Sequence, residues 1–372
     1  MADLFQRCRE YTLIDDAKAM GLYPYFLPLT QNEGPEVILE GRRTLMLGSN
    51  NYLGLSMDPR VKAGAAAALE KYGTSCSGSR FLNGTLDLHE ELEGRLAAFL
   101  RKPAATVVST GYQTNLATLG GILQRSDTAV MDKQCHASLY EGVMISRCRI
   151  KRYEHLDTAD CDDVLAKIGP DKPTAILTDG VFSMEGHLAP LPELVALKKK
   201  HNSVLFVDDA HGLGTMGPNG RGTCEHFGVE DDVDVILGTF SKSFASLGGV
   251  VAGPTEVINY IKHHGRSIIY SASMSPAALG AALAALNVME SDPEPRMRLH
   301  ENVARMRKGL LELGFKVGET ESPVLPIHIG EEMRMLPFWR MLLNEGVYTN
   351  AVIPPAVAPD DTMIRTSFMA TH

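Results

Sequence analysis

Polar and titratable side chains follow five short apolar runs of this sequence, at the point where each run ends. The five segments are Thr110–Tyr112, Lys133–His136, Asp179–Ser183, Asp208–His211 and Gly238–Lys242. Buried parallel strands read as continuous apolar runs, and functional groups in such sheets lie just beyond the carboxyl ends of the strands. A structural core does not require five polar strand ends, so the pattern predicts one site at a single edge of a sheet.

These side chains fit the chemistry of one cofactor. The hydroxyls of Thr239 and Ser241, with the backbone amides at the Gly111–Tyr112 helix start, predict an anion site for a phosphate. Lys242, beside that site at the end of a strand, could form an imine with an aldehyde. An aspartate deeper in the site could hold a ring nitrogen protonated. A phosphate, an aldehyde and a pyridine nitrogen together describe pyridoxal phosphate, and no residue pattern indicates a metal site.

Each of these residues taken alone has a structural interpretation. A lone histidine such as His136 is more often a satisfied core residue, and Asp208 could simply cap a turn. A Ser-Lys pair such as Ser241-Lys242 is more often surface than catalytic. The shared position at strand ends is what favours a cofactor site over these interpretations.

A rival motif, Gly212-Leu-Gly214-Thr-Met-Gly217, has the G-x-G-x-x-G spacing of a dinucleotide fingerprint. That fingerprint requires a helix to open at the glycines, so that the pyrophosphate meets the helix N-terminus. Here the turn sequence Pro218-Asn-Gly-Arg-Gly222 follows, and the motif lies after a late strand rather than in the first βα unit. A nicotinamide site is therefore disfavoured, and the lack of a G-x-x-x-x-G-K-[ST] segment excludes a P-loop.

The elements that must position these groups alternate between strand and helix. Six apolar runs, 106–109, 129–131, 175–178, 204–207, 233–237 and 250–253, are separated by helical segments, which predicts a layered α/β domain. Before them we expect an amphipathic helix over 3–20, a hairpin of 36–39 with 44–47, and helices over 60–72 and 87–100. After them we expect helices over 276–291, 293–314 and 333–345 and strands at 324–329 and 363–368, as in a smaller α+β domain.

The composition is that of a globular protein with a net negative charge. At 372 residues, 44% hydrophobic and 22% charged with a net charge of −9, the chain can bury a large core and lacks the basic footprint of a nucleic-acid module. No apolar run approaches the ~18 residues of a membrane span, and the first ten residues predict no signal peptide. The six cysteines form no C-x-x-C pair, which favours a reducing, cytoplasmic location.

Glycine is more frequent than usual. The sequence has 34 among 372 residues, about 9% against a typical ~7%. Several of them, including Gly111, Gly180 and Gly212, follow predicted strands. We expect the backbone to turn sharply there, beside a flat cofactor.

Three stretches of the sequence resemble a known enzyme family. Ser49-Asn-Asn-Tyr-Leu-Gly-Leu, Asp208-Asp-Ala-His211-Gly and Gly238-Thr-Phe-Ser-Lys242-Ser are similar to motifs of the α-oxoamine synthases, and the similarity runs in order over nearly the whole chain. Members of this family are pyridoxal-phosphate enzymes that condense an amino acid with an acyl-CoA. Two further stretches, 72–85 and 179–186, look most like those of the family's bacterial serine palmitoyltransferases.

This resemblance implies the fold and the assembly. The implied fold is the α/β PLP-dependent transferase fold type I, whose large domain has a mostly parallel seven-stranded sheet sandwiched by helices and is joined to a smaller α+β C-terminal domain. We expect an N-terminal helix and hairpin segment over 1–45, the large domain over 46–275 and the small domain over 276–372. The family's active sites form at a dimer interface, which implies a homodimer in which Ser273 reaches the phosphate of the neighbouring subunit.

The resemblance also implies roles for individual residues. Lys242 would carry the cofactor and later move the Cα proton of the substrate, and Asp208 would pair with the pyridinium nitrogen. His211, with Ser183, would contact the ring oxygen, and His136 would stack on the ring and orient the substrate carboxylate. The other implied contacts are Thr239, Ser241 and the Gly111 and Tyr112 amides to the phosphate, and Asn51 and Arg365 to the substrate carboxylate.

The implied reaction joins L-serine to palmitoyl-CoA and releases CoA and CO2, giving a 3-ketosphinganine-type aminoketone at the first step of sphingolipid biosynthesis. A glycine- or alanine-using member, of the 8-amino-7-oxononanoate synthase or 2-amino-3-ketobutyrate CoA ligase type, is the alternative. A plain aminotransferase would release no CoA, and the presence of Lys242 argues against a scaffold subunit. The loop 354–360 is interpreted equally well as an acyl channel or a stiff surface loop. A long-chain substrate also implies transient membrane contact, although the net charge of −9 opposes strong attraction to anionic headgroups.

Overall fold

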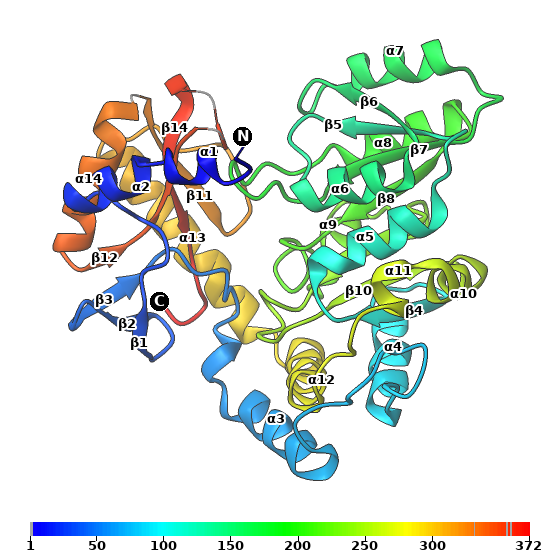
Figure 1. Cartoon of the computed structure of the whole chain (residues 1–372), viewed down its shortest axis with the longest axis horizontal. Helices are drawn as coiled ribbons and strands as arrows, with labels where there is room; N and C mark the ends of the chain where they lie inside the picture. The colour runs from blue at the N-terminus through cyan, green and yellow to red at the C-terminus, as the bar shows by residue number, and fades with distance from the viewer. Residues whose placement is uncertain (1–2, 331, 355, 358) are drawn as a thin grey trace.

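The computed structural model describes residues 3–330, 332–354, 356–357 and 359–372. Its larger part is built on a seven-stranded sheet in the order β4-β10-β9-β8-β7-β5-β6, on the right of Figure 1. The strands are Ala104–Val108 (β4), Thr128–Asp132 (β5), Arg149–Tyr153 (β6), Thr174–Asp179 (β7), Val204–Asp208 (β8), Val235–Thr239 (β9) and Gly249–Gly253 (β10). β10 is antiparallel to both of its neighbours, and the other pairs are parallel. The predicted mostly parallel seven-stranded sheet is therefore confirmed.

Helices cover both faces of this sheet. They are α5 (Gly111–Ile122), α6 (Ala137–Ser146) and α10 (Thr255–His264) on one face, and α7 (Thr158–Ile168) and α8 (Leu191–Lys200) on the other. Along β5, Ala129 and Met131 pack in the hydrophobic cluster with α5, α6 and α10, and Val130 packs in the cluster with α7 and α8. Successive side chains of a strand point to opposite faces of the sheet. The sheet is thus buried on both sides, which explains why its inner strands read as uninterrupted apolar runs.

The edge strand β6 is the one strand of this sheet without a predicted apolar run. Its sequence, Arg149-Ile-Lys-Arg-Tyr153, is mostly charged, and Tyr153 is its only buried residue. The strand pairs with β5 alone, so its side chains reach solvent, and Lys and Arg are typical of protected sheet edges. Hydrophobicity could not reveal a strand of this kind.

Two smaller sheets lie on the left of Figure 1. One is the antiparallel sheet of β11 (Val324–Gly330), β14 (Thr362–Ser367) and β13 (Asn350–Val352), and the other contains β1 (Leu29–Asn32), β2 (Glu36–Leu39), β3 (Arg42–Met46) and β12 (Val347–Tyr348). The antiparallel pair of β2 with β3 confirms the predicted hairpin. β12 pairs in parallel with β3 and so joins the two ends of the sequence. The helix α14 (Glu332–Asn344) packs Trp339 into the cluster that contains Ile364 of β14.

The remaining long helices confirm four predicted segments. They are α3 (Pro59–Tyr72), α4 (Asp87–Phe99), α12 (Pro276–Ser291) and α13 (Glu294–Glu312); the short elements are α9 (Thr223–His226), α11 (Arg266–Ile269), η1 (Leu55–Met57) and η2 (Pro359–Asp361). Within the residues that the structure describes, none of the helices is long and apolar enough to cross a membrane. The division into domains at residues 46 and 276 stays a prediction.

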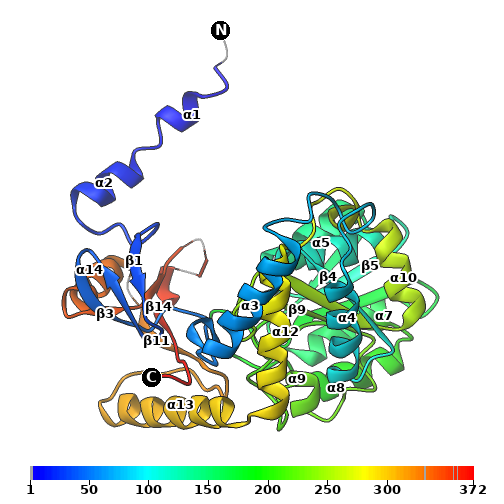
Figure 2. The same cartoon turned by 90° about the horizontal axis from the view of Figure 1, so that it is seen from below.

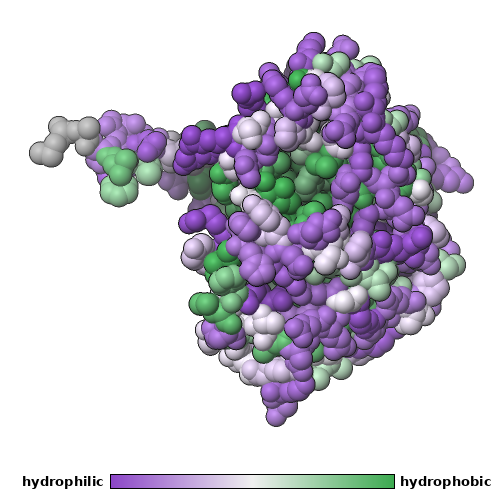
Figure 3. All heavy atoms as spheres, turned by 90° about the vertical axis from the view of Figure 1, so that its right-hand side faces the viewer, coloured by the Kyte–Doolittle hydropathy of each residue, from purple (hydrophilic) through white to green (hydrophobic). Residues whose placement is uncertain are grey.

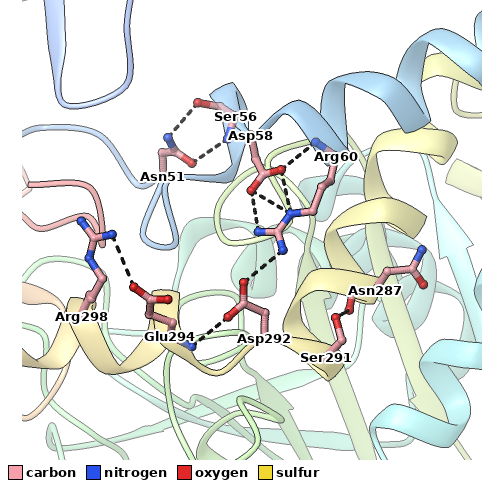
Figure 4. A network of polar contacts seen from close by, with 9 residues as sticks. All are labelled: Asn51, Ser56, Asp58, Arg60, Asn287, Ser291, Asp292, Glu294 and Arg298. Carbon is pink, nitrogen blue, oxygen red and sulfur yellow. Dashed lines mark hydrogen bonds and ion pairs between the residues drawn. The ribbon is translucent and has the colours of Figure 1, made fainter.

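The junction between α12 and α13 is tied to the start of α3, as Figure 4 shows. Asp58 caps α3 by accepting the backbone amide of Arg60 at 2.8 Å, and Arg60 Nη1 donates to Asp292 Oδ2 at 3.0 Å. The helices α3 and α12 also approach each other closely at Gly64 and Gly280. A Cβ on either glycine would lie within 3 Å of the carbonyl oxygen of the other. Partly exposed ion pairs contribute little stability, so the close approach of α3 and α12 does not depend on the Arg60–Asp292 pair alone.

The N-terminal segment differs from the prediction. The single helix expected over 3–20 is wrong: the structure has two short helices, α1 (Gln6–Arg9) and α2 (Leu13–Ala19), and neither buries a residue. Figure 2 shows the segment extending away from the rest of the chain. Helices of this length are marginal without tertiary packing, so the apolar periodicity alone does not hold the turn at 10–12 in a helix.

His89 couples the stability of the fold to pH. The residue is fully buried in α4, and its Nδ1 accepts the backbone amide of Leu86 at 3.0 Å. Burial lowers the pKa of His89 to about 4. Because an unfolded histidine has a pKa of about 6.5, the unfolded chain takes up the proton first, and the contribution of His89 to stability is lost as the pH falls from about 6.5 to 4.

We expect His89→Gln to lose less stability on acidification than the wild type. Glutamine can accept the same amide, as in a capping box, but does not titrate. The difference in the free energy of unfolding between the two proteins should therefore change by up to about 3 kcal/mol between pH 7 and pH 4. Urea unfolding at several pH values measures it, and a difference that stays constant over this range would contradict the prediction.

Candidate active site

Nine of the predicted cofactor residues line one cavity at the carboxyl edge of the large sheet. The cavity has a volume of about 280 Å³, near the lower end of the ~300–1,000 Å³ usual for ligand pockets. The nine are Gly111, Tyr112, His136, Ser183, Asp208, His211, Thr239, Ser241 and Lys242. They follow β4, β5, β7, β8 and β9, so the five strand ends meet as the sequence analysis expected.

One end of the cavity has the donors of an anion site. Thr110 caps α5 by accepting the amide of Gln113 at 3.1 Å, while the amides of the first helical turn have no partner inside the helix. The hydroxyls of Thr239 and Ser241 lie 2.9 Å apart across from this turn. A Cβ on Gly111 would lie within 3 Å of Thr239 Oγ1, so only glycine lets the helix approach these hydroxyls. This corner can hold a phosphate.

A line of buried polar groups supports the floor of the cavity. Asn115 Nδ2 donates to Asp208 Oδ2 at 2.6 Å and lies 2.7 Å from Ser138 Oγ, which in turn is 2.6 Å from His136 Nδ1. The amide of Ala210 donates to the other oxygen of Asp208 at 3.1 Å. These bonds orient the Asp208 carboxylate and the His136 ring together. Asn115 and Ser138 were not predicted, since no sequence spacing connects α5 to the end of β8.

Burial shifts the pKa values of Lys242 and Asp179 strongly from their usual values. Burial lowers the pKa of Lys242 to about 8, so a substantial fraction of its amine is neutral and nucleophilic in mildly basic solution. Asp179 lies beside Asp208 in the register of β7 with β8, and burial together with the neighbouring Asp208 charge raises the pKa of Asp179 well above its usual range. The pairing of the two strand ends therefore opposes ionisation of Asp179 beside Asp208.

His211 faces residues from the start of the chain. Its Nδ1 lies 2.6 Å from the hydroxyl of Tyr52, which is 3.2 Å from Asn50 Oδ1. Burial lowers the pKa of His211 well below its usual value, and the nearby Lys242 acts in the same direction, so the ring stays neutral. Tyr52 and Asn50 belong to the quoted Ser49–Leu55 motif but were given no role, because a motif does not show which side chains turn inward.

The two residues predicted to hold the substrate carboxylate, Arg365 and Asn51, do not line the cavity, and they have different hydrogen-bond partners. Arg365, from β14, is nearly buried and donates to the Ser183 carbonyl at 2.5 Å and to Asn50 Oδ1 at 3.0 Å. Asn51 instead exchanges hydrogen bonds with Ser56, at 2.8 and 3.3 Å, as Figure 4 shows. The structure thus brings Arg365 to the rim of the cavity beside Ser183, with Asn50 rather than Asn51 on its guanidinium.

Ser273 also lies outside the cavity of its own chain. Its hydroxyl donates to the carbonyls of Gly78 and Gly84 at 3.1 and 2.7 Å. Ser273 thus does not line the cavity of its own chain. Its predicted contact with the phosphate of a neighbouring subunit stays a prediction. The loop interpreted as an acyl channel contains Pro355 and Ala358, which lie outside the described residues.

A larger cleft of about 850 Å³ lies near Arg80, Glu93 and Lys262. Arg80 and Lys262 both pair with the buried Glu93, at 2.7 and 3.1 Å. Both of these cations are thus engaged by Glu93, and none of the five strand ends contributes to the cleft. The smaller cavity is therefore the candidate active site.

The donor set of the cavity fits pyridoxal phosphate. The glycine at position 111 leaves room for an anion at the helix start, Lys242 is a buried amine with a lowered pKa, and Asp208 is a carboxylate held by two donors. Together with the doubly covered, mostly parallel sheet, they define the class of PLP-dependent enzymes with the aminotransferase fold. The model of the family "Aminotransferase class I and II" matches residues 42–372, and the chain belongs to this family.

Individual relatives show which enzymes of this family the chain is similar to. The chain is 45% identical to serine palmitoyltransferases of Sphingobacterium spiritivorum, over 99% of this chain and 92% of that one, and of Bacteroides thetaiotaomicron, over 100% and 94%. It is 40% identical to 8-amino-7-oxononanoate synthase of Geobacter sulfurreducens, over 96% and 92%. The solved serine palmitoyltransferase of Sphingomonas wittichii superposes with a TM-score of 0.96 at 34% identity, covering 100% of this chain and 94% of that one. The predicted resemblance to the α-oxoamine synthases is confirmed.

Proposed function

We propose that this protein is a serine palmitoyltransferase: with pyridoxal phosphate, it condenses L-serine with a long-chain acyl-CoA, palmitoyl-CoA above all, to a 3-ketosphinganine-type aminoketone, CoA and CO2. The observation that carries the proposal is the convergence of Lys242, Asp208 and the phosphate corner in one cavity. Full-length similarity at 45% identity to serine palmitoyltransferases supports the choice of reaction within the family, since the 8-amino-7-oxononanoate synthases are less similar.

The chain's own residues account for the proton handling that this reaction needs. Pyridoxal phosphate, when bound, supplies an electron sink for the charge left at the substrate Cα. Asp208, held by Asn115, keeps the proton on the ring nitrogen on which that sink depends. Lys242, with its pKa lowered to about 8, can take the Cα proton and return one after CO2 has left. The hydroxyls of Thr239 and Ser241 hold the phosphate end in place.

His136 and Arg365 orient the substrates in this proposal. The His136 ring is held by Ser138 at the edge of the cavity, where it can cover one face of the cofactor ring. Arg365 presents a planar guanidinium to the rim, where it suits a carboxylate in two-point contact. With Asn50 on the same guanidinium, the rim can bind the amino acid by its carboxylate and leave Cα over the ring.

We also propose that the protein works as a homodimer with its sites between the two copies. Two large side chains of the cavity lining, Tyr112 and Leu247, are exposed, and so are Met144, Ile145 and Tyr270 elsewhere on the surface. Figure 3 shows hydrophobic surface gathered in a hollow on one face of the molecule. Surfaces of this kind mark interaction sites. Sedimentation equilibrium should give twice the mass of the chain, and a monomer that is fully active would contradict the shared site.

The test of the reaction is CoA release with palmitoyl-CoA and a series of amino acids. We expect serine to give the highest kcat/KM, glycine and alanine to give much less, and no CoA release without an amino acid. A preference for glycine would favour the 8-amino-7-oxononanoate synthase or 2-amino-3-ketobutyrate CoA ligase type instead. Turnover of a keto acid without CoA release would indicate an aminotransferase and contradict the proposal.

A further inference from the structure

The glycine motif that starts at Gly212 has no part in the proposed reaction, yet it directly follows His211, which lines the cavity. The loop 212–222 connects the segment after β8 to α9, and it does not open a helix at its glycines. The carboxyl group of Asp209 lies beneath it and is completely buried. Asp209 follows Asp208 and precedes His211, so any constraint on its side chain acts on the turn that carries both of these residues.

Three glycines from separate segments surround the Asp209 carboxyl group. A Cβ on Gly180, after β7, or on Gly212 would lie within 3 Å of its Oδ1, and a Cβ on Gly222 would lie within 3 Å of its Oδ2. At Gly212 the backbone conformation is one that alanine can adopt, so a side chain there would meet the carboxyl group of Asp209, which would have to shift, rather than backbone strain. The expectation that Gly180 and Gly212 serve turns beside a flat cofactor therefore has a different physical reason: they leave room for Asp209.

Hydrogen bonds tie Asp209 to the same segments. Its Oδ2 accepts the amide of Thr223 at 2.6 Å, and its backbone carbonyl accepts the amides of Gly212 and Leu213 at 3.1 and 2.9 Å. Its own amide donates to the carbonyl of Leu237 in β9 at 2.8 Å. Its Oδ1 has no hydrogen-bond partner among the described residues, which fits a carboxyl group whose pKa burial raises to about 7.

The far side of the loop is held independently. Glu225 accepts the amides of Asn219 and Arg221, both at 3.0 Å, and His300 of α13 lies 2.7 Å from the carbonyl of Thr215. In the middle, a Cβ on Gly214 would lie within 3 Å of the side chain of Ser243, the residue after Lys242. The loop thus contacts Asp209 at Gly212 and Gly222, and the residue after Lys242 at Gly214.

We propose that Asp209 is a positioning residue: by clamping the glycine loop 212–222, which contacts both Asp209 and the segment after Lys242, it sets the places of Asp208, His211 and Lys242 toward the cofactor. The inference deepens the proposed function and rests on it, because the seat it describes is that of pyridoxal phosphate. Asp209 itself does not line the cavity, so it acts through its neighbours. The clamp needs the size of the side chain more than its charge.

Three substitutions separate size from charge. Asp209→Glu adds a methylene to a site closed by three glycines, and overpacking of this kind corresponds to about a tenfold or larger loss of cofactor affinity. Asp209→Asn keeps the size and the acceptor for Thr223, and should bind pyridoxal phosphate within about threefold of the wild type. Asp231→Glu, the same change at an exposed aspartate, is the control and should bind like the wild type.

A double-substitution cycle tests the contact itself. Gly212→Ala should weaken pyridoxal phosphate binding strongly in the wild type but only slightly in Asp209→Ala, because the smaller side chain leaves room for the new methyl group. The readouts are the dissociation constant and the visible absorption band of the bound cofactor, together with the thermal stability of each protein without it. The band should shift in Asp209→Glu at saturating cofactor and stay unchanged in Asp209→Asn.

The outcomes distinguish this inference from the proposed function. If Asp209→Glu binds the cofactor with the wild-type affinity and spectrum, or if Gly212→Ala costs the same in both backgrounds, the clamp is overturned while the function stands. If the wild type itself binds no pyridoxal phosphate, the proposed function fails first. A loss of thermal stability in Asp209→Glu with an unchanged dissociation constant and spectrum would assign Asp209 to folding alone and overturn its positioning role.

Discussion

Replacing Lys242 with alanine should abolish CoA release and remove the visible absorption band of the lysine-bound cofactor. In the proposed reaction Lys242 supplies both the amine that joins the cofactor aldehyde and the base that moves the Cα proton. Proton transfer alone corresponds to about 10²–10⁴-fold in rate, and loss of the covalent link adds to it. Absorbance of the protein with added pyridoxal phosphate and CoA release at saturating substrates measure the two effects separately.

Lys242→Arg provides the matched control for charge. Arginine keeps a cation next to Asp208, but its guanidinium stays protonated and does not form an imine with the aldehyde. Both variants should therefore lack the band, while their thermal stabilities stay close to that of the wild type, because Lys242 has no salt bridge that stabilises the fold among the described residues. A Lys242→Ala protein that keeps the visible band would overturn the assignment of the cofactor link.

The convergence of the five strand ends in one cavity could be predicted from the sequence because these residues follow the strands directly. Continuous apolar runs locate the inner strands, since both of their faces are buried, and the topology of a parallel sheet brings their carboxyl ends together. Gly111, Asp208 and Lys242 could thus be assigned to one cavity without knowing any side-chain position. The strand β6 escaped the same reasoning because an edge strand needs no apolar face.

The contacts that the sequence did not reveal are those made through space between distant segments. Asn115 reaches Asp208 across 93 positions, and Tyr52 reaches His211 across 159. No periodicity or spacing encodes such pairs. The neighbouring asparagines show the limit most clearly: Asn50 contacts Arg365 and Asn51 contacts Ser56, and only the backbone turn decides which of the two faces the site.

Three carboxyl groups are buried close together at the ends of β7 and β8, those of Asp179, Asp208 and Asp209. Three ionised carboxylates in this space would repel one another strongly. Burial raises the pKa of Asp179 well above its usual range and that of Asp209 to about 7. Asp208 is the one of the three with two hydrogen-bond donors, Asn115 Nδ2 and the Ala210 amide, on separate oxygens. The hydrogen-bond donors of the cluster therefore gather on Asp208, the residue that the proposed function places at the ring nitrogen.

Asp208→Asn should consequently lower kcat by on the order of 10²–10³-fold while pyridoxal phosphate still binds. Asparagine preserves the shape of the side chain but removes the charge that, in the proposed reaction, keeps the ring nitrogen protonated, so we expect the Cα proton to become harder to remove. Asp179→Asn is the matched control on the neighbouring strand: burial holds the pKa of its carboxyl group well above the usual range, so replacing it by an amide removes less charge than at Asp208, and kcat should fall less than about tenfold. Equal losses in the two variants would mean that the charge is shared between the strands, and a full-rate Asp208→Asn would exclude Asp208 as the partner of the ring nitrogen.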